Sequence, residues 1–298
     1  MRSALLACCF LGVALHAQNA RQLALQAMLG GMNSRLNNGQ PSGQRVIADS
    51  DRLAAGFTGL GSSVGGFSQD DYQRNRELAR DAFAWLARAR AMYAADPAVS
   101  QSLMNTYGVI GDFYRNYGTF YPAGAMMAYS CSNSLARGLV LDPGRGRSFE
   151  RDLERTAMSW AALGSLQQEA CAPGQPPPGE AAPPPPPEDI PATPLPQVDE
   201  SKLDEQQKAQ WTDARDRFVT VAPKVQEART LMAQLAARLA QQGPNITVNP
   251  QDAAAALMMQ GFLDDAAGLI RAGQFDKASE ALTRADYMRK KLRSVTGQ

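Results

Sequence analysis

The stretch NPQDAAAALMMQGFLDDAAGLIRAGQFDKASEALTRADYMRKKLRS, residues 249–294, decides the fold. Its opening asparagine and proline supply a helix cap followed by a proline at the first helical position, which predicts a helix over residues 250–271. Gly273 predicts a turn, because glycine adopts backbone angles that other residues avoid. The helical spacing of the apolar residues after it predicts a last helix over residues 275–294. Since alternating β-branched runs are absent along the chain, we expect an all-α protein.

A heptad precedes this hairpin, in residues 201–242. Pro223 interrupts it, so we expect the helix to kink or restart there. Together with the hairpin, this helix predicts an antiparallel three-helix bundle over residues 200–298, with the heptad on its first helix. The alternative is a coiled coil between chains, which would make the protein a homo-oligomer through its seven-spaced large residues, Trp211, Phe218, Val225, Met232 and Leu239.

A proline-rich segment over residues 172–199 separates the bundle from the rest of the chain. Twelve of the 19 prolines lie between Pro173 and Pro196. Such a segment cannot form the interior of a helix or sheet and favours the extended polyproline II conformation. We therefore expect a linker, and before it an N-terminal domain of helical hairpins over residues 18–171.

Residues 1–17 have the pattern of a secretory signal peptide. A positive start at Arg2 is followed by twelve apolar residues from Ala4 to Leu15. Twelve helical residues span about 18 Å, which is too short for a bilayer core of about 30 Å. We expect export to the periplasm or the cell exterior. We expect no transmembrane helix in the remaining chain.

Composition narrows the chemistry of the exported protein. The single histidine, His16, lies in the signal peptide. Without it, catalytic triads that use histidine, histidine-ligated metal sites and covalent haem attachment are excluded. The net charge of +1 favours no nucleic-acid partner. We expect no cofactor and no bound metal, and a function other than catalysis.

Export also predicts the state of the cysteines. Cys8 and Cys9 leave with the signal peptide, so only Cys131 and Cys171 reach the oxidising compartment. A disulfide between these two is the ordinary expectation there. The absence of a Cys-x-x-Cys motif argues against a redox-active pair.

The N-terminal domain has fewer local signals. The five glycines in residues 56–67 predict a loop. Ser68 and Asp71 then form a capping box for a helix whose end Pro97 marks. The apolar face of that helix is expected to lie in the core, and its members are Leu78, Ala82, Trp85, Leu86, Ala89 and Tyr93.

Two stretches, residues 104–137 and 259–292, resemble the tetratricopeptide repeat. Each carries Gly-x-Phe-x-x-Ala at the end of its first helix, and most other offsets agree. Asp265 departs from the resemblance, because it occupies a position that is usually apolar. The resemblance implies helical hairpins that bind a protein or peptide. Its residues are Tyr107, Ile110, Gly111, Tyr114, Gly118, Phe120, Ala123 and Met127, then Phe262, Ala266, Leu269, Gly273, Phe275, Ala278, Leu282 and Ala285.

Three functions remain open from the sequence. The first is an exported, non-catalytic scaffold whose exposed aromatic residues bind a protein, peptide or glycan. The second is a spacer of the cell envelope that self-associates through the heptad. The third is a glycan hydrolase that uses paired carboxylates, with Asp70–Asp71 and Asp264–Asp265 as the visible pairs. The candidate partner-binding residues are Tyr107, Tyr114, Arg115, Tyr117 and Tyr121.

Overall fold

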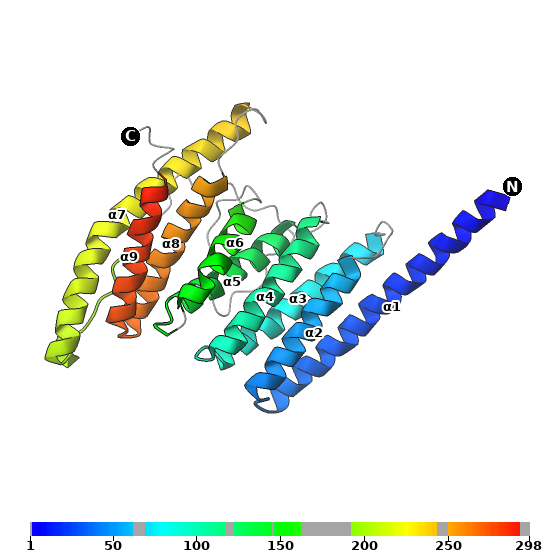
Figure 1. The fold of residues 1–298 in the computed structure, drawn as a ribbon, viewed down its shortest axis with the longest axis horizontal. Coiled ribbons are helices and arrows are strands. Elements are labelled where there is room, and N and C mark those ends of the chain that lie inside the picture. Colours follow the sequence, from blue (N-terminus) through cyan, green and yellow to red (C-terminus); the bar gives the residue numbers. More distant parts are fainter. Residues whose placement is uncertain are drawn as a thin grey trace. The chain divides into compact units, whose positions relative to one another are not determined.

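Helices account for every regular element that the structure describes (Figure 1). This confirms the predicted all-α class. Contacts between residues divide the chain into two compact units: unit 1 is residues 1–136 and 170–181, and unit 2 is residues 137–169 and 182–298. The structure is a computed structural model, and it describes residues 2–61, 69–116, 122–144, 146–161, 192–242 and 250–292.

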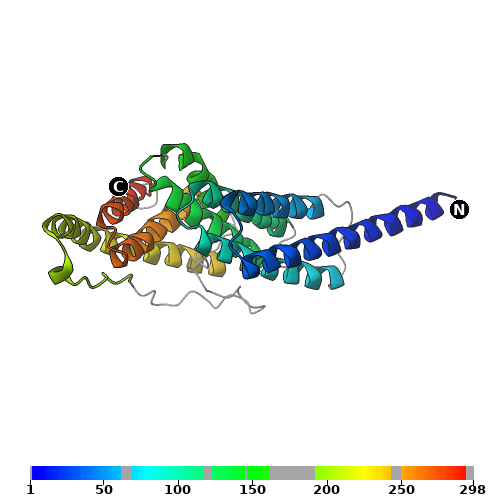
Figure 2. The same cartoon turned by 90° about the horizontal axis from the view of Figure 1, so that it is seen from below.

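Unit 1 is built from helices packed side by side. α2 packs on α4, and α1 packs on α3 and α2 (Figure 2). Its core residues recur at helical spacing, so each helix buries one stripe and leaves a polar face to solvent. The helices are α1 (Arg2–Asn38), α2 (Gly43–Gly61), α3 (Gln69–Met92), α4 (Pro97–Asn116) and α5 (Pro122–Val140), whose last turn belongs to unit 2.

The predicted loop over residues 56–67 is wrong in its first part, because α2 continues to Gly61. Phe57 and Leu60 are fully buried and hold this last turn of the helix. Gly56 is required where it stands, since a Cβ atom there would lie 2.5 Å from Leu25 of α1. The glycine thus permits close packing of two helices. Residues 62–67 lie outside the described residues.

The first repeat-like stretch forms α4 and α5. Gly111 lies where α4 meets the ring of Tyr129 on α5, and a Cβ atom on Gly111 would lie 2.6 Å from that ring. The hydroxyl of Ser132 donates a hydrogen bond of 2.8 Å to the carbonyl of Met104. Pro97 occupies the first position of α4, and Asp96 caps it by accepting from the backbone N–H of Ala98 at 2.9 Å.

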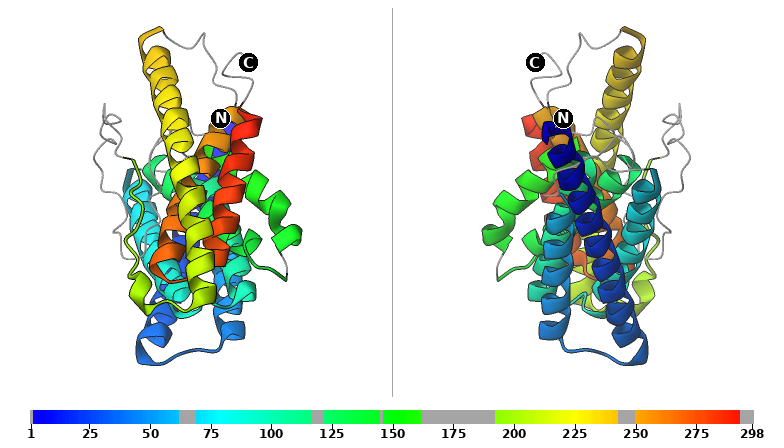
Figure 3. Two further views of the ribbon diagram at one scale, coloured as in Figure 1. Left: turned by 90° about the vertical axis from the view of Figure 1, so that its left-hand side faces the viewer. Right: turned by 90° about the vertical axis from the view of Figure 1, so that its right-hand side faces the viewer.

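Unit 2 contains a set of mutually contacting helices. α8 packs on α9, α7 packs on both, and α6 packs on α8. Figure 3 shows α7, α8 and α9 running alongside one another. The elements are η1 (Gly146–Phe149), α6 (Glu150–Ala161), η2 (Glu200–Lys202), α7 (Glu205–Gln242), α8 (Pro250–Arg271) and α9 (Phe275–Lys291).

The seven-spaced residues of the heptad whose side chains are described face the interior of unit 2. Four of them are at most 4% exposed, and the side chain of Leu239 lies outside the described residues. Trp211 contacts Phe275 of α9, with ring centroids 5.7 Å apart. The helix continues through Pro223 and does not restart there. Helices of the same unit therefore cover these four side chains, and self-association through the heptad stays a prediction. The buried four are Trp211, Phe218, Val225 and Met232.

The hairpin of α8 and α9 matches its sequence signals closely. Gly273 has φ of 70°, which confirms the predicted turn. The backbone N–H groups of Gly273 and Gln274 close the end of α8 by donating to the carbonyls of Ile270 and Leu269. Among the described residues, α8 alone is long and apolar enough to cross a membrane, and 72% of its apolar window is buried. The absence of a transmembrane helix stays a prediction.

The contacts divide the chain elsewhere than at the proline-rich segment. Because α6 packs on α8, residues 137–161 belong to unit 2, although the sequence groups them with residues 18–171. Residues 192–199, the end of the proline-rich segment, have no helix or strand and lead into η2. Residues 172–191 lie outside the described residues.

Candidate functional site

The structure places two of the predicted partner-binding tyrosines in the core. Tyr107 and Tyr114 are 1% and 0% exposed, so neither is available to a ligand in this fold. The ring of Tyr107 stacks on Phe83 at 6.0 Å between centroids. The hydroxyl of Tyr114 donates to the backbone carbonyl of Asn75 at 2.6 Å. Arg115 is exposed. The other two, Tyr117 and Tyr121, lie outside the described residues.

Burial of tyrosine hydroxyls predicts a loss of stability at alkaline pH. Burial raises the pKa of Tyr107 above its ordinary value of about 10, and nearby Arg90 opposes this. Burial also raises the pKa of Tyr129, and Asp112 adds to the shift. The stability due to these neutral hydroxyls is complete below about pH 10, where the unfolded chain is also protonated. It is lost as the pH rises further, because only the unfolded chain ionises.

We therefore expect tyrosinate absorbance from these two residues to appear together with the loss of helical circular dichroism. Tyr107→Phe removes one hydroxyl and should move the alkaline midpoint to higher pH. Two results together would contradict this prediction. One is an unchanged alkaline midpoint for Tyr107→Phe, and the other is tyrosinate absorbance that appears before helical circular dichroism is lost.

Of the two cysteines in the predicted disulfide, the structure describes only Cys131. Cys131 lies on α5, is 1% exposed and is disulfide-bonded. Cys171 lies outside the described residues, so the predicted pairing of Cys131 with Cys171 stays a prediction.

The carboxylate pair on α8 is engaged with two different neighbours. Asp265 accepts from Arg137, with Nε and Oδ2 2.7 Å apart. Asp264 accepts from the hydroxyl of Thr193 at 2.8 Å and from the amide of Gln260 at 2.8 Å. The two carboxylates thus point to different partners, as adjacent helical positions predict. The side chains of Asp70 and Asp71 lie outside the described residues.

Two grooves run along opposite sides of α9. The first, between α7 and α9, has a volume of about 680 Å³, and Val221 and Leu282 contribute to its apolar wall. The second, between α6 and α9, has a volume of about 490 Å³, with Leu153 and Met288 in its wall. Both volumes fall in the range of ligand sites. The two grooves share Thr283 and Tyr287 of α9.

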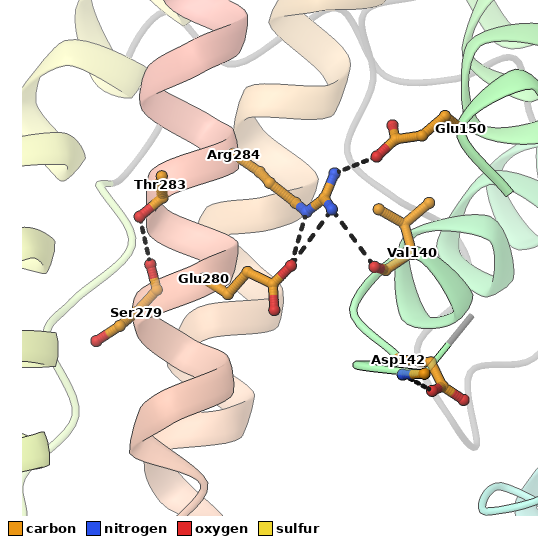
Figure 4. Close-up of polar contacts among 8 residues, drawn as sticks. Val140, Asp142, Glu150, Ser279, Glu280, Thr283 and Arg284 are labelled. Carbon is orange, nitrogen blue, oxygen red and sulfur yellow. Dashed lines mark hydrogen bonds and ion pairs between the residues drawn. The ribbon is translucent and has the colours of Figure 1, made fainter. Parts of the chain in front are cut away.

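A polar cluster holds α6 against α9 (Figure 4). The guanidinium of Arg284 donates to Glu150 at 2.9 Å and to Glu280 at 3.3 Å. It also donates to the backbone carbonyl of Val140 at 3.5 Å. One cation therefore serves two carboxylates. With Glu154 also in the wall, the charges that line this groove sum to a negative value.

Polar contacts join α7 and α9 along the groove between these two helices. Lys224 of α7 donates to Asp286 of α9 at 2.8 Å, and this contact lowers the pKa of Asp286. Arg217 contacts Asp213 at 2.9 Å and lowers its pKa. Arg217 also donates to the hydroxyl of Thr283 at 3.0 Å. Acidic and basic side chains balance along this wall.

Tyr287 forms the ridge between the two grooves. It is 54% exposed, so much of its amphipathic ring is accessible to a partner. The sequence-based expectations did not include Tyr287, because they centred on the aromatic residues now found in unit 1. The available signal was the helical spacing of Glu280, Thr283, Arg284 and Tyr287 on one face of the last helix.

Among the described side chains, no group of three or more histidine, cysteine, aspartate or glutamate residues could hold a metal ion. The grooves combine apolar walls with fixed charges, which suits recognition of a mixed polar and apolar surface. Comparison of the chain with family models, with curated proteins and with solved structures finds no match.

Proposed function

We propose that the protein is an exported, non-catalytic helical scaffold that binds a peptide segment of a partner protein. One observation carries this proposal: Tyr287 stands exposed between two grooves whose volumes are those of ligand sites. Exposed tyrosine is a frequent anchor of protein interfaces, because its ring gives a large contact area at little cost in conformational entropy. The predicted signal peptide, residues 1–17, belongs to the same proposal.

The walls of the grooves indicate the chemistry of the partner. Three carboxylates and one guanidinium line the groove between α6 and α9, and its wall includes Leu153 and Met288. A segment with a basic side chain beside an apolar one fits such a wall. The resemblance of residues 259–292 to a tetratricopeptide repeat supports the same kind of partner. An apolar side chain of the segment would lie against the ring of Tyr287.

Panning a phage-displayed library of random peptides on the full-length protein tests this proposal. We expect the enriched peptides to carry lysine or arginine next to an apolar residue. Synthetic copies should lose about thirtyfold in affinity for Tyr287→Ala, which is the effect of about 2 kcal/mol expected for an interface anchor. The affinities can be measured by fluorescence anisotropy.

Leu23→Ala is the matched control, because Leu23 is a comparably exposed apolar residue in unit 1. Its affinities should equal those of the wild-type protein. If the enriched peptides bind Tyr287→Ala as tightly as they bind the wild type, the grooves beside α9 are not the binding site.

A further inference from the structure

The end of the proline-rich segment lies on unit 2 as an extended strap, defined here as residues 192–198. The strap precedes η2 and α7 and has no helix or strand of its own (Figure 3). Half-buried and exposed side chains alternate along most of the strap. Thr193, Leu195, Pro196 and Val198 are half-buried, whereas Ala192, Pro194 and Gln197 are exposed.

One side chain of the strap makes specific polar contacts with α8. The hydroxyl of Thr193 donates to Oδ1 of Asp264 at 2.8 Å. It also accepts from Nε2 of Gln260 at 3.1 Å. Nε2 of Gln260 donates to the same Asp264 oxygen at 2.8 Å, which fixes the orientation of the amide. The face of α8 thus presents a preformed donor and a preformed acceptor to an extended chain.

The strap leaves part of this face unsatisfied. Oε1 of Gln260 is buried and has no hydrogen-bond partner in the structure. A buried acceptor without a donor costs free energy, typically about 1–3 kcal/mol. Threonine has a single hydroxyl proton, and that proton is committed to Asp264. A ligand side chain with two donors, such as an asparagine amide, has a second proton to offer beside the one given to Asp264.

The surroundings of this face also favour a donor. Arg229 of α7 is half-buried, which lowers its pKa, and the charge of Asp264 opposes that shift. The side chain of Asp264 is itself half-buried. Hydrogen bonds to such a carboxylate are stronger than bonds between neutral groups. A ligand that donates to Asp264 should therefore bind this site more tightly than one that cannot.

We propose that the face of α8 around Gln260 and Asp264 is a second peptide-binding site, which takes an extended, proline-flanked segment, and that the strap is its resident intramolecular ligand. The prolines on both sides of Thr193 reduce the entropy that such a segment loses on binding. Because the strap is part of the chain, it competes with a separate ligand at high effective concentration. A ligand with an amide at the position of Thr193 gains the hydrogen bond that the strap lacks.

The test uses the full-length protein and a labelled peptide with the sequence of residues 190–198, IPATPLPQV. Thr193→Val in the protein keeps the shape of the strap and removes its hydroxyl. We expect the peptide to bind Thr193→Val at least about tenfold more tightly than the wild type, because the intramolecular competitor is weakened. The control is Thr58→Val in unit 1, whose exposed hydroxyl bonds to its own helix. It should bind like the wild type.

Changes in the peptide test the chemistry of the site. With valine in place of its threonine, the peptide should bind Thr193→Val about tenfold more weakly. With asparagine there, it should bind more tightly than the threonine peptide. Asp264→Ala, combined with Thr193→Val, should reduce the difference between the threonine and valine peptides, whereas the asparagine peptide should keep the advantage that it gains from Oε1 of Gln260.

Two results would overturn the proposal. One is equal affinity of the peptide for the wild type and for Thr193→Val. The other is no binding to Thr193→Val at peptide concentrations up to about 1 mM, a dissociation constant equivalent to about 4 kcal/mol. In either case the strap is a fixed part of the fold. Tyr287→Ala should not change the affinity for this peptide, so failure of this site and failure of the site beside α9 are separate results.

Discussion

Asp265→Ala is expected to lower the free energy of unfolding by about 3–5 kcal/mol, because it leaves the charge of Arg137 buried and without this carboxylate. The side chain of Arg137 is fully buried and donates to Asp265 through two nitrogens, at 2.7 and 3.4 Å. The guanidinium is 0% exposed, so the substitution removes a charged partner from a cation that water does not reach in this structure. Thermal unfolding followed by circular dichroism should show a midpoint lowered by about 6–15 °C.

Asp264→Ala is the matched control, because it removes the neighbouring carboxylate of α8 and leaves Arg137 paired. Its cost should be about 1 kcal/mol, the value of an ordinary hydrogen bond, here to Thr193. Replacing both partners, as in Arg137→Met with Asp265→Leu, should recover most of the stability that Asp265→Ala loses. Equal effects of the two alanine substitutions would mean that the ion pair contributes nothing beyond a surface contact.

The ion pair explains a feature of the sequence that local patterns could not. Asp265 departs from the repeat-like pattern because Arg137, 128 residues earlier in the chain, supplies its partner. Gly261 belongs to the same contact, since a Cβ atom there would overlap the guanidinium of Arg137. No spacing rule connects residues so far apart, so the pair is visible only after the chain has folded.

Local signals predicted the elements that local chemistry controls. The predicted helix over residues 250–271 agrees with α8 at both ends, since a proline starts it and Gly273 follows its end. The loop predicted over residues 56–67 is wrong up to Gly61 for the opposite reason. There Gly56 allows close packing against Leu25, and this contact comes from another helix.

The candidate site shows the same limit. Tyrosines such as Tyr107 drew attention as possible ligand contacts, yet burial is decided by the packing of α4 against its neighbours. Tyr287 looks ordinary in the sequence. It gains its importance from the two grooves beside it, which exist only once α6, α7 and α9 are together. A residue's type is therefore a weaker guide to binding than the shape around it.

Phe218→Ala is expected to lower the free energy of unfolding by about 3–5 kcal/mol, through the lost burial of the ring and the cavity left behind. Phe218 is 2% exposed and belongs to the heptad seam, which packs within unit 2. The neighbouring Val219 is 59% exposed, so Val219→Ala should change the free energy by about 0.5 kcal/mol or less. Denaturant unfolding of the full-length variants measures both values.

The same variants separate an internal seam from one between chains. For an internal seam, the unfolding midpoints of the wild type and of Phe218→Ala should stay constant over a hundredfold range of protein concentration. A seam between chains would make the midpoint rise with concentration, because association stabilises only the folded state. In that case Phe218→Ala would convert an oligomer into a folded monomer. Burial of the seam against α8 and α9 predicts the first result, and with it a single chain as the unit that binds a partner.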